Sequence, residues 1–184
     1  MKKSDEGSFG KWFTSRAIYY PTLLWNLSLG RLLKVRDWWN VIDDHVVLGA
    51  VPFPRDVLAL ADMGVRGIVN TCEEYDGPVN EYQQFGIEQF HMPTIDFTHP
   101  SDDDVDTAIA FIEKHVSAGN KVYVHCKAGR GRSATVAICW LMKSQGITAA
   151  EAQQKLTAAR PHVNQHLTDR PVVQRFEKAL SESS

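Results

Sequence analysis

The sequence contains few cysteines and no arrangement of them that would build a disulfide or zinc framework. Its 184 residues include only Cys72, Cys126 and Cys139, and no two of these form a Cys-x-x-Cys pair. An odd and widely spaced set disfavours both a disulfide-stapled secreted scaffold and a cysteine-rich zinc module. The pattern favours free thiols in a reducing compartment.

The chain also has no long apolar run and no strong excess of either charge. No stretch approaches the roughly 20 apolar residues that a membrane-spanning helix needs. With a net charge of −2, any attraction to anions must come from local clusters, so we expect no nucleic-acid partner. An apolar content of 43% in 184 residues suffices for one domain with a sizeable core. We expect a monomer.

Acidic residues are missing from the interval between Gly7 and Arg36. The interval and its ends hold five cations and six interleaved aromatic residues: Lys11, Arg16, Arg31, Lys34 and Arg36, with Phe9, Trp12, Phe13, Tyr19, Tyr20 and Trp25. This mixture suits a peripheral contact with a membrane interface. It equally suits a helix that packs its rings on the core and leaves its cations in water. We therefore separate an N-terminal segment, residues 1–35, from a folded domain, residues 36–184.

From residue 40 onward, β-rich runs alternate with helical patterns, which predicts an α/β domain with a central, mostly parallel sheet flanked by helices. The predicted strands are 45–51, 65–72, 87–94 and 121–126, and the predicted helices are 54–64, 101–119, 132–145, 148–160 and 170–180. Ser101 is placed to cap one helix, and Thr148 with Glu151 forms a capping box for another. The helix over 132–145 is apolar nearly all round, so we expect it at the centre of the fold.

The most informative stretch is "HCKAGRGRS", residues 125–133, which joins a predicted strand to that central helix. In α/β folds, ligands bind at the carboxyl ends of parallel strands. Gly129 and Gly131 let successive backbone N–H groups turn toward one point, and the helix N-terminus aims its unpaired N–H groups at the same point. The loop backbone from Lys127 through Ala128 to Arg132 is therefore predicted to cradle a phosphate.

Basic side chains strengthen this interpretation. Lys127 and Arg130 add positive charge, and the planar fork of Arg132 can bind two phosphoryl oxygens. The same surroundings would change Cys126, because a helix N-terminus and neighbouring cations lower a thiol pKa from about 8.5 to ~3.5–7.5. An ordinary strand–turn–helix junction with a buried cysteine is the alternative. We favour a thiolate nucleophile, since the groups that would activate it are those that would bind phosphate.

The loop, read as "VHCKAGRGRSAT", resembles the signature of cysteine-dependent phosphatases of the dual-specificity and lipid phosphatase branch. The further segments that carry the resemblance are "YYPTLLW", "RDWWNVID", "VVLGAVP", "VRGIVNTCEEYD" and "TIDFT". With them, residues from about 17 to 180 are similar to the mitochondrial-type phosphatases that act on phosphatidylglycerophosphate. The resemblance implies a single-domain cysteine-phosphatase fold, no cofactor, no metal, and an anionic phospholipid substrate.

The resemblance also implies roles for individual residues. Cys126 would attack phosphorus to form a phosphocysteine, while Arg132 and the loop amides would stabilise the transferring group. Asp96 matches the general acid, Ser133 the hydroxyl that hydrogen-bonds the sulfur, and His125 a residue that helps to order the loop. From the residues alone, Asp96 could instead be a loop aspartate that accepts backbone hydrogen bonds, and Ser133 an ordinary first-turn helix residue.

In the family that the chain resembles, the segment holding Glu73, Glu74 and Tyr75 borders the active site and helps to shape it. Acidic residues there would repel phosphate unless they bind hydroxyls or anchor the basic loop, and a solvated turn is the alternative. Cys72 could form a protective disulfide with Cys126 or simply be a buried strand cysteine.

Other polar clusters have simpler explanations. Asp102, Asp103 and Asp104 fit the positive end of the helix that they begin. His162 and His166 share a helical spacing but lack nearby acidic or cysteine ligands, so no metal site is predicted.

We therefore expect hydrolysis of phosphatidylglycerophosphate to phosphatidylglycerol. Alternatives with the same chemistry are a dual-specificity protein tyrosine/serine phosphatase and a phosphoinositide phosphatase. A catalytically inactive phosphate-binding module and a rhodanese-like sulfurtransferase are alternatives of other classes. The expected location is the cytoplasm or the matrix side of an organelle, peripheral to the inner membrane if residues 1–35 bind lipid.

Overall fold

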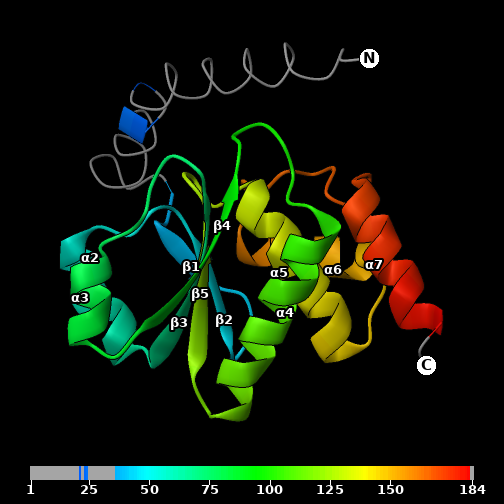
Figure 1. Ribbon diagram of the computed structural model, residues 1–184. Coiled ribbons are helices and arrows are strands. Elements are labelled where there is room, and N and C mark those ends of the chain that lie inside the picture. The colour runs from blue at the N-terminus through cyan, green and yellow to red at the C-terminus, as the bar shows by residue number, and fades with distance from the viewer. Residues whose placement is uncertain (1–20, 22, 25–35, 183–184) are drawn as a thin grey trace, which may run out of the picture.

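The computed structural model describes residues 21, 23, 24 and 36–182, which build a five-stranded sheet with helices on both faces (Figure 1). In chain order the strands are β1 (Trp39–Val41), β2 (Val46–Gly49), β3 (Val65–Cys72), β4 (Glu88–Thr94) and β5 (Lys121–His125). Their order across the sheet is β1-β2-β5-β3-β4, and only β1 runs antiparallel to its neighbour. The predicted α/β class with a mostly parallel sheet is confirmed.

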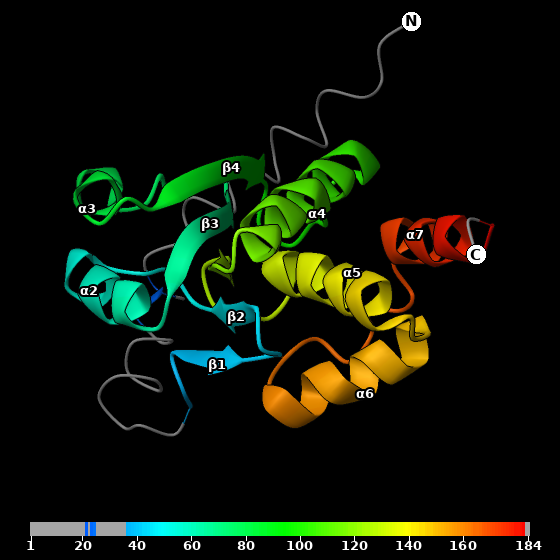
Figure 2. The ribbon, with the colours of Figure 1, turned by 90° about the horizontal axis from the view of Figure 1, so that it is seen from below.

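The helices of the described residues divide between the two faces of this sheet. They are α2 (Pro54–Asp62), α3 (Val79–Gln84), α4 (Asp102–Ser117), α5 (Arg132–Gln145), α6 (Ala149–Ala159) and α7 (Pro171–Glu182). Figure 2 shows α2 and α3 on one face and the other four helices on the opposite face. Within the described residues, no helix combines the length and the apolar composition that crossing a bilayer requires.

The predicted capping signals act as expected. The Ser101 hydroxyl accepts a hydrogen bond from the N–H of Asp104, and Thr148 and Glu151 form a reciprocal capping box. Helix α5 is the central helix, because residues 132–142 are all buried, as the apolar pattern predicted. Its side chains join those of β2, β3 and β5 in the largest cluster of buried apolar residues.

Two elements were not predicted, and both are short. Strand β1 has three residues and no buried one, so it shows no alternation of apolar and polar side chains. Helix α3 has six residues, and Pro78 before it supplies no side-chain cap. Elements of this length take their stability from tertiary neighbours rather than from a pattern in the sequence.

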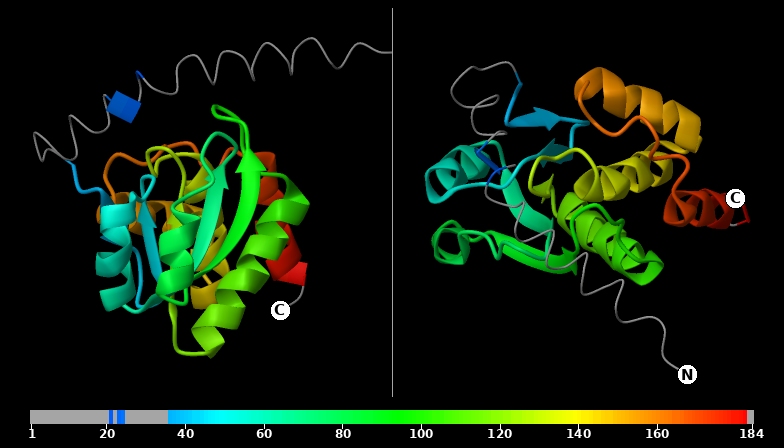
Figure 3. Two further views of the ribbon diagram at one scale, coloured as in Figure 1. Left: turned by 60° about the vertical axis from the view of Figure 1, so that its left-hand side comes forward. Right: turned by 90° about the horizontal axis from the view of Figure 1, so that it is seen from above.

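Three parallel strands place their carboxyl ends at one edge of the sheet. Asn70 of β3 lies opposite His125 of β5, and Cys72 of β3 lies opposite Thr94 of β4. The segments that follow these strands therefore leave the sheet side by side, at the top of Figure 1 and of the left view of Figure 3. This edge brings together the Glu73–Tyr75 segment, the Asp96 segment and the loop of Cys126.

Candidate active site

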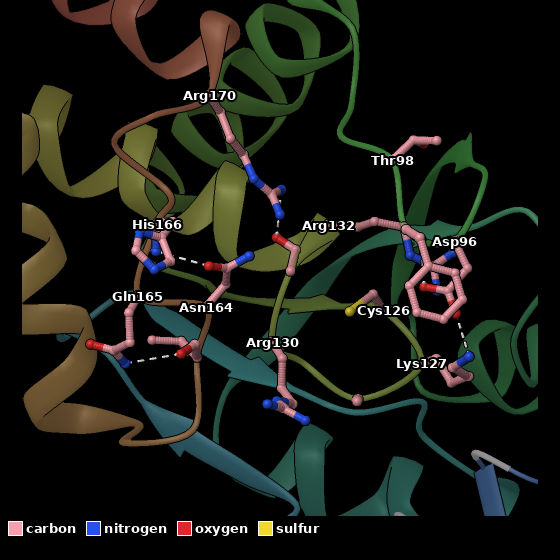
Figure 4. A pocket seen from close by; sticks show the side chains of 14 residues that line it. Asp96, Thr98, Cys126, Lys127, Arg130, Arg132, Asn164, Gln165, His166 and Arg170 are labelled. Carbon is pink, nitrogen blue, oxygen red and sulfur yellow. Dashed lines mark hydrogen bonds and ion pairs between the residues drawn. The ribbon is translucent and has the colours of Figure 1, made fainter.

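The loop between β5 and α5 holds Cys126 at the bottom of a pocket (Figure 4). Only 4% of the residue is exposed. Its Sγ accepts hydrogen bonds from the backbone N–H of Gly129 and from the hydroxyl of Ser133, and both distances are 3.2 Å. Ser133 lies in the first turn of α5, so the helix N-terminus points toward the sulfur. The structure thus contains the anion cradle that the sequence pattern requires.

The loop conformation depends on a glycine and on a buried cation behind it. Gly129 has a φ of 66°, and a Cβ at this position would lie 2.5 Å from the carbonyl carbon and oxygen of Gly49. Arg160, which is 1% exposed, donates to the carbonyl oxygens of Gly129 at 2.8 Å and Ala128 at 3.0 Å. Because these carbonyls are turned back toward Arg160, the loop N–H groups can face the pocket.

The electrostatic balance at Cys126 favours its thiolate. Burial alone would raise the pKa of the thiol, but the positive charge of Arg132, hydrogen bonds from the hydroxyl and N–H of Ser133, and a backbone hydrogen bond from Arg130 outweigh it. The resulting pKa is about 7. The lowered pKa increases the share of thiolate at neutral pH.

Arg132 is fixed by a two-pronged ion pair with Glu74. Its guanidinium donates to the two carboxylate oxygens at 2.7 and 2.8 Å and to the carbonyl oxygen of Thr94 at 2.8 Å. Both charged side chains are almost fully buried, with 2% and 4% exposed. Burial opposes the charge of Arg132, but the hydrogen bond with Glu74 and the negative charges of Cys126, Cys72 and Glu74 together outweigh it, so the pKa of Arg132 is raised.

The acidic segment predicted to shape the site acts from behind the pocket. The Tyr75 hydroxyl donates to the carbonyl oxygen of Pro52 at 2.6 Å, and the Asn70 side-chain amide donates to the carbonyl oxygen of Tyr75 at 2.6 Å. None of Glu73, Glu74 and Tyr75 is among the lining residues of the pocket. Of the three possibilities that the sequence left open, which were hydroxyl binding, anchoring of the basic loop and a solvated turn, Glu74 fulfils the second.

Asp96 lies between two cations of the cradle. Its carboxylate forms an ion pair with Lys127 and lies 3.1 Å from Nη2 of Arg132. Lys127 is itself buried, and Figure 4 shows its side chain directed at Asp96. The acid and the phosphate-binding cations are thus in contact, so an arriving phosphate would compete with Asp96 for the same donors.

The pocket has a volume of about 630 Å³, much larger than one phosphoryl group. Its lining consists of Asp96, Phe97, Thr98, Cys126, Lys127, Ala128, Arg130, Gly131, Arg132, Val163, Asn164, Gln165, His166 and Arg170. In Figure 4, Asp96 and Thr98 lie on one side of Cys126, and the residues from Asn164 to His166 lie on the other.

The sequence analysis did not predict the side of the pocket that is formed by residues 164–166 and Arg170. Arg170 donates to the carbonyl oxygen of Gly131 at 3.2 Å and to the hydroxyl of Thr135. The N–H of Asn164 donates to the carbonyl oxygen of Arg130 at 2.9 Å, and Nε of Arg130 donates to the carbonyl oxygen of His162 at 2.7 Å. No local sequence pattern indicates these residues, because they lie in the irregular segment between α6 and α7.

His125 and Cys72 lie beneath the pocket. The His125 ring stacks on Tyr123 and meets Tyr75 edge-on, with ring centroids 5.7 and 6.5 Å apart. Burial, then the neighbouring His91 and Arg132, lowers the pKa of His125 to about 3, so the ring is neutral. Cys72 is a free, buried thiol in the same apolar cluster as Cys126, and burial raises its pKa. Within the described residues, no group of three or more histidine, cysteine or acidic side chains could hold a metal ion.

Comparisons with known proteins agree with this geometry. The family model "Dual specificity phosphatase, catalytic domain" matches residues 55–171. The chain is 40% identical over 175 residues to phosphatidylglycerophosphate phosphatase PTPMT2 of Arabidopsis thaliana, which covers 92% of this chain and 77% of that protein. It is 34% identical over 176 residues to the Homo sapiens phosphatidylglycerophosphatase and protein-tyrosine phosphatase 1, covering 91% and 88%.

A solved structure extends the likeness to three dimensions. The crystal structure of PTPMT1 in complex with PI(5)P superimposes with a TM-score of 0.73 at 31% identity, and the match covers 80% of this chain and 99% of that one. A second crystal structure, of Tk-PTP in its active form, gives a TM-score of 0.69 at 32% identity over 77% and 97% of the two chains.

The electrostatics predict the pH dependence of alkylation at Cys126. A lowered pKa means that the thiolate is lost only as pH falls below about 7, so the rate of reaction with iodoacetamide should rise through pH 7 and then level off. Ser133→Ala removes a hydrogen bond to the charged form and should raise the midpoint by about 1 pH unit. Mass spectrometry of the labelled peptide provides the measurement. An unchanged midpoint in the variant would contradict the role of Ser133.

The ion pair beneath the pocket predicts a catalytic cost for Glu74→Gln. Loss of the charged partner leaves the buried guanidinium of Arg132 less firmly oriented, and hydrogen bonds to charged groups contribute about 1.5–3 kcal/mol. We expect kcat/KM to fall ~10- to 100-fold. Glu88→Gln, which removes an exposed carboxylate paired with Lys114, is the matched control. Equal effects of the two substitutions would show that Glu74 does not position Arg132.

Proposed function

Because the chain belongs to the dual-specificity phosphatase family, we propose that it hydrolyses phosphatidylglycerophosphate to phosphatidylglycerol and phosphate. It is a cysteine-dependent phosphatase. The observation that carries the proposal is the anion cradle around Cys126, which opens into a pocket with room for more than a phosphoryl group. The choice of phosphatidylglycerophosphate as the substrate is supported by the names of the relatives described above. An inactive binding module would have no use for a thiol with a lowered pKa or for an acid beside it.

In the first proposed step, Sγ of Cys126 attacks phosphorus opposite the ester oxygen. The S–P bond forms as the P–O bond breaks, and the electron pair leaves with the glycerol oxygen. Arg132 and the loop N–H groups hold the three equatorial oxygens, where charge is spread in the transition state. Asp96 donates a proton to the departing oxygen.

Substrate binding would prepare Asp96 for this task. In the unliganded site its carboxylate contacts Lys127 and Arg132. A phosphate dianion carries more charge than the carboxylate and offers oxygens that match the fork of Arg132. It would therefore displace Asp96 from Arg132 and leave the acid free to turn toward the ester oxygen.

In the second proposed step, water attacks the phosphocysteine and Asp96 accepts its proton. The S–P bond breaks and the electron pair returns to sulfur as a thiolate. The Ser133 hydroxyl, 3.2 Å from Sγ, stabilises that charge. The same hydrogen bonds that lower the pKa of the nucleophile thus make it a better leaving group.

The assignment of the chain to an N-terminal segment, residues 1–35, and a catalytic domain, residues 36–184, stays part of the proposal. Most of the first segment lies outside the described residues. Its cations and aromatic residues support a peripheral contact with the membrane that contains the substrate. Such a contact fits a location at the inner membrane, on the cytoplasmic or matrix side.

A phosphoinositide phosphatase is the second candidate, because a similar structure was solved in complex with PI(5)P. Lys127, Arg130 and Arg170 line the pocket beyond the one arginine that the chemistry requires, and extra cations suit either polyanionic headgroup.

A substrate panel distinguishes the candidates. Purified enzyme is assayed for phosphate release from monomeric short-chain phosphatidylglycerophosphate, short-chain phosphoinositides and a phosphotyrosyl peptide. We expect kcat/KM to be at least about tenfold higher for phosphatidylglycerophosphate, because the relatives that match most of this chain are phosphatases named for that lipid. Higher activity toward a phosphoinositide or the peptide would overturn the proposed substrate without affecting the mechanism.

The role of Asp96 predicts a dependence on the leaving group. Asp96→Ala should lower turnover of an alkyl phosphate about 10²–10⁴-fold, because an alkoxide leaves poorly without a proton. An aryl phosphate with a good leaving group should lose much less. Steady-state kinetics with both substrates provide the comparison, and losses of equal size would exclude Asp96 as the general acid.

A further inference from the structure

Phe97 is the most exposed of the large apolar side chains in the described part of the protein. Its exposed fraction is 75%, against 63% for Leu24 and 55% for Leu58. The ring faces Lys127, whose Nζ lies 5.5 Å from the ring centroid. An aromatic ring in this position leaves most of its apolar surface in water, which is unfavourable.

The backbone holds the ring outward at a further cost. The N–H of Thr98 donates to the carbonyl oxygen of Ile95 at 3.1 Å, so residues 95–98 form a tight turn with Phe97 as its third residue. Phe97 has a φ of 64°, and among the described residues it is the one non-glycine residue with positive φ. Turns with this geometry normally carry glycine or asparagine there, because a side chain with a Cβ is strained. Exposure and strain thus coincide in one residue.

The residue stands at the mouth of the pocket. It follows Asp96 directly and lines the pocket. Its segment, between β4 and α4, lies at the same end of the molecule as residues 21, 23 and 24 (Figures 1 and 3). There Leu24 is also exposed, while Leu23 packs against the apolar cluster that contains Cys126. Two exposed apolar side chains therefore border the end at which substrate must enter.

We propose that Phe97 contacts the lipid bilayer, inserting its ring at the headgroup level while the substrate headgroup occupies the pocket. This inference rests on the proposed lipid substrate. Two acyl chains keep such a substrate in the bilayer, so its terminal phosphate lies only a short distance outside the surface. Cys126 is buried at the bottom of the pocket, and the phosphate can reach it only if the rim meets the bilayer. Aromatic rings are favoured at that depth.

The charges around the rim indicate that the ring contributes more to this contact than long-range attraction does. Arg130 is exposed at the pocket mouth, but Asp102 and Asp103 are exposed at the start of α4, where Arg175 pairs with Asp102. With mixed local charge and a net charge of −2, electrostatic attraction is weak. A single ring is too small for a protein-docking surface, whereas it adds directly to interfacial binding.

The test compares one enzyme on two forms of the same lipid. Phosphatidylglycerophosphate is presented in phosphatidylcholine vesicles or as monomeric short-chain lipid. Phe97→Asn keeps a residue that tolerates positive φ, so its melting temperature should not fall. We expect kcat/KM on vesicles to drop five- to twentyfold more than on monomeric lipid. Phe97→Trp should retain the wild-type ratio, and Leu58→Ser, on the exposed face of α2, should leave the ratio unchanged.

Equal losses of Phe97→Asn on both forms would overturn the proposal, since they would place the ring on the headgroup instead. No loss on either form would also overturn it. The Cys126→Ser variant separates this inference from the substrate assignment. We expect this variant to co-sediment with phosphatidylcholine–phosphatidylglycerol vesicles, which contain no phosphomonoester. Adding Phe97→Asn to it should weaken the co-sedimentation by about the same five- to twentyfold factor. That result would stand even if another substrate were preferred in the panel, and unchanged co-sedimentation would overturn the membrane contact.

Discussion

The site depends on keeping a sulfur anion at the buried end of a parallel strand. Burial there favours the neutral thiol, because the thiolate loses its hydration. The charge of Arg132 and the hydrogen-bond donors of the loop must therefore stabilise the thiolate by more than that loss. Arg132 is itself buried and needs Glu74 for the same reason. A buried ion pair adds little to stability compared with apolar residues of the same volume. The Glu74–Arg132 pair is therefore better understood as a device that keeps one donor in one orientation than as a source of fold stability.

Pairing of opposite charges also connects the acid, Asp96, to the phosphate-binding loop. Asp96 contacts Lys127 and Arg132 when no phosphate is present, so its carboxylate adds negative charge to that which Glu74 already places beside Arg132. A bound phosphate takes over that role. Binding of the substrate and release of the acid then become one event, because both draw on the same two cations. An acid with such a role must be able to move, and Asp96 lies in the tight turn of residues 95–98 that follows β4, outside any helix or strand.

The parts of this site that the sequence predicts are those contiguous in the chain. Cys126, Gly129, Arg132 and Ser133 lie within eight residues, and a strand–glycine–helix pattern suffices to place them around one point. Arg160 and Arg170 could not be found in this way. They reach the loop from beyond α6, through hydrogen bonds to backbone carbonyls that carry no signal in the sequence. Glu74 is intermediate, since its segment was singled out but its partner was not. The short elements β1 and α3 escaped prediction for the related reason that long-range packing defines them.

Phe97 shows where local rules fail and why that failure is informative. Turn preferences would place glycine or asparagine at its position, and burial preferences would place a phenylalanine in the core. The chain violates both at a residue adjacent to its acid and at the rim of its pocket. Strain persists only where the surrounding structure maintains it, and it tends to gather at functional sites. A soluble substrate would diffuse into the pocket and give the rim no reason to carry such a side chain. A substrate anchored in a bilayer requires the rim itself to approach the lipid, and an outward aromatic ring then gains the burial that it lacks in water.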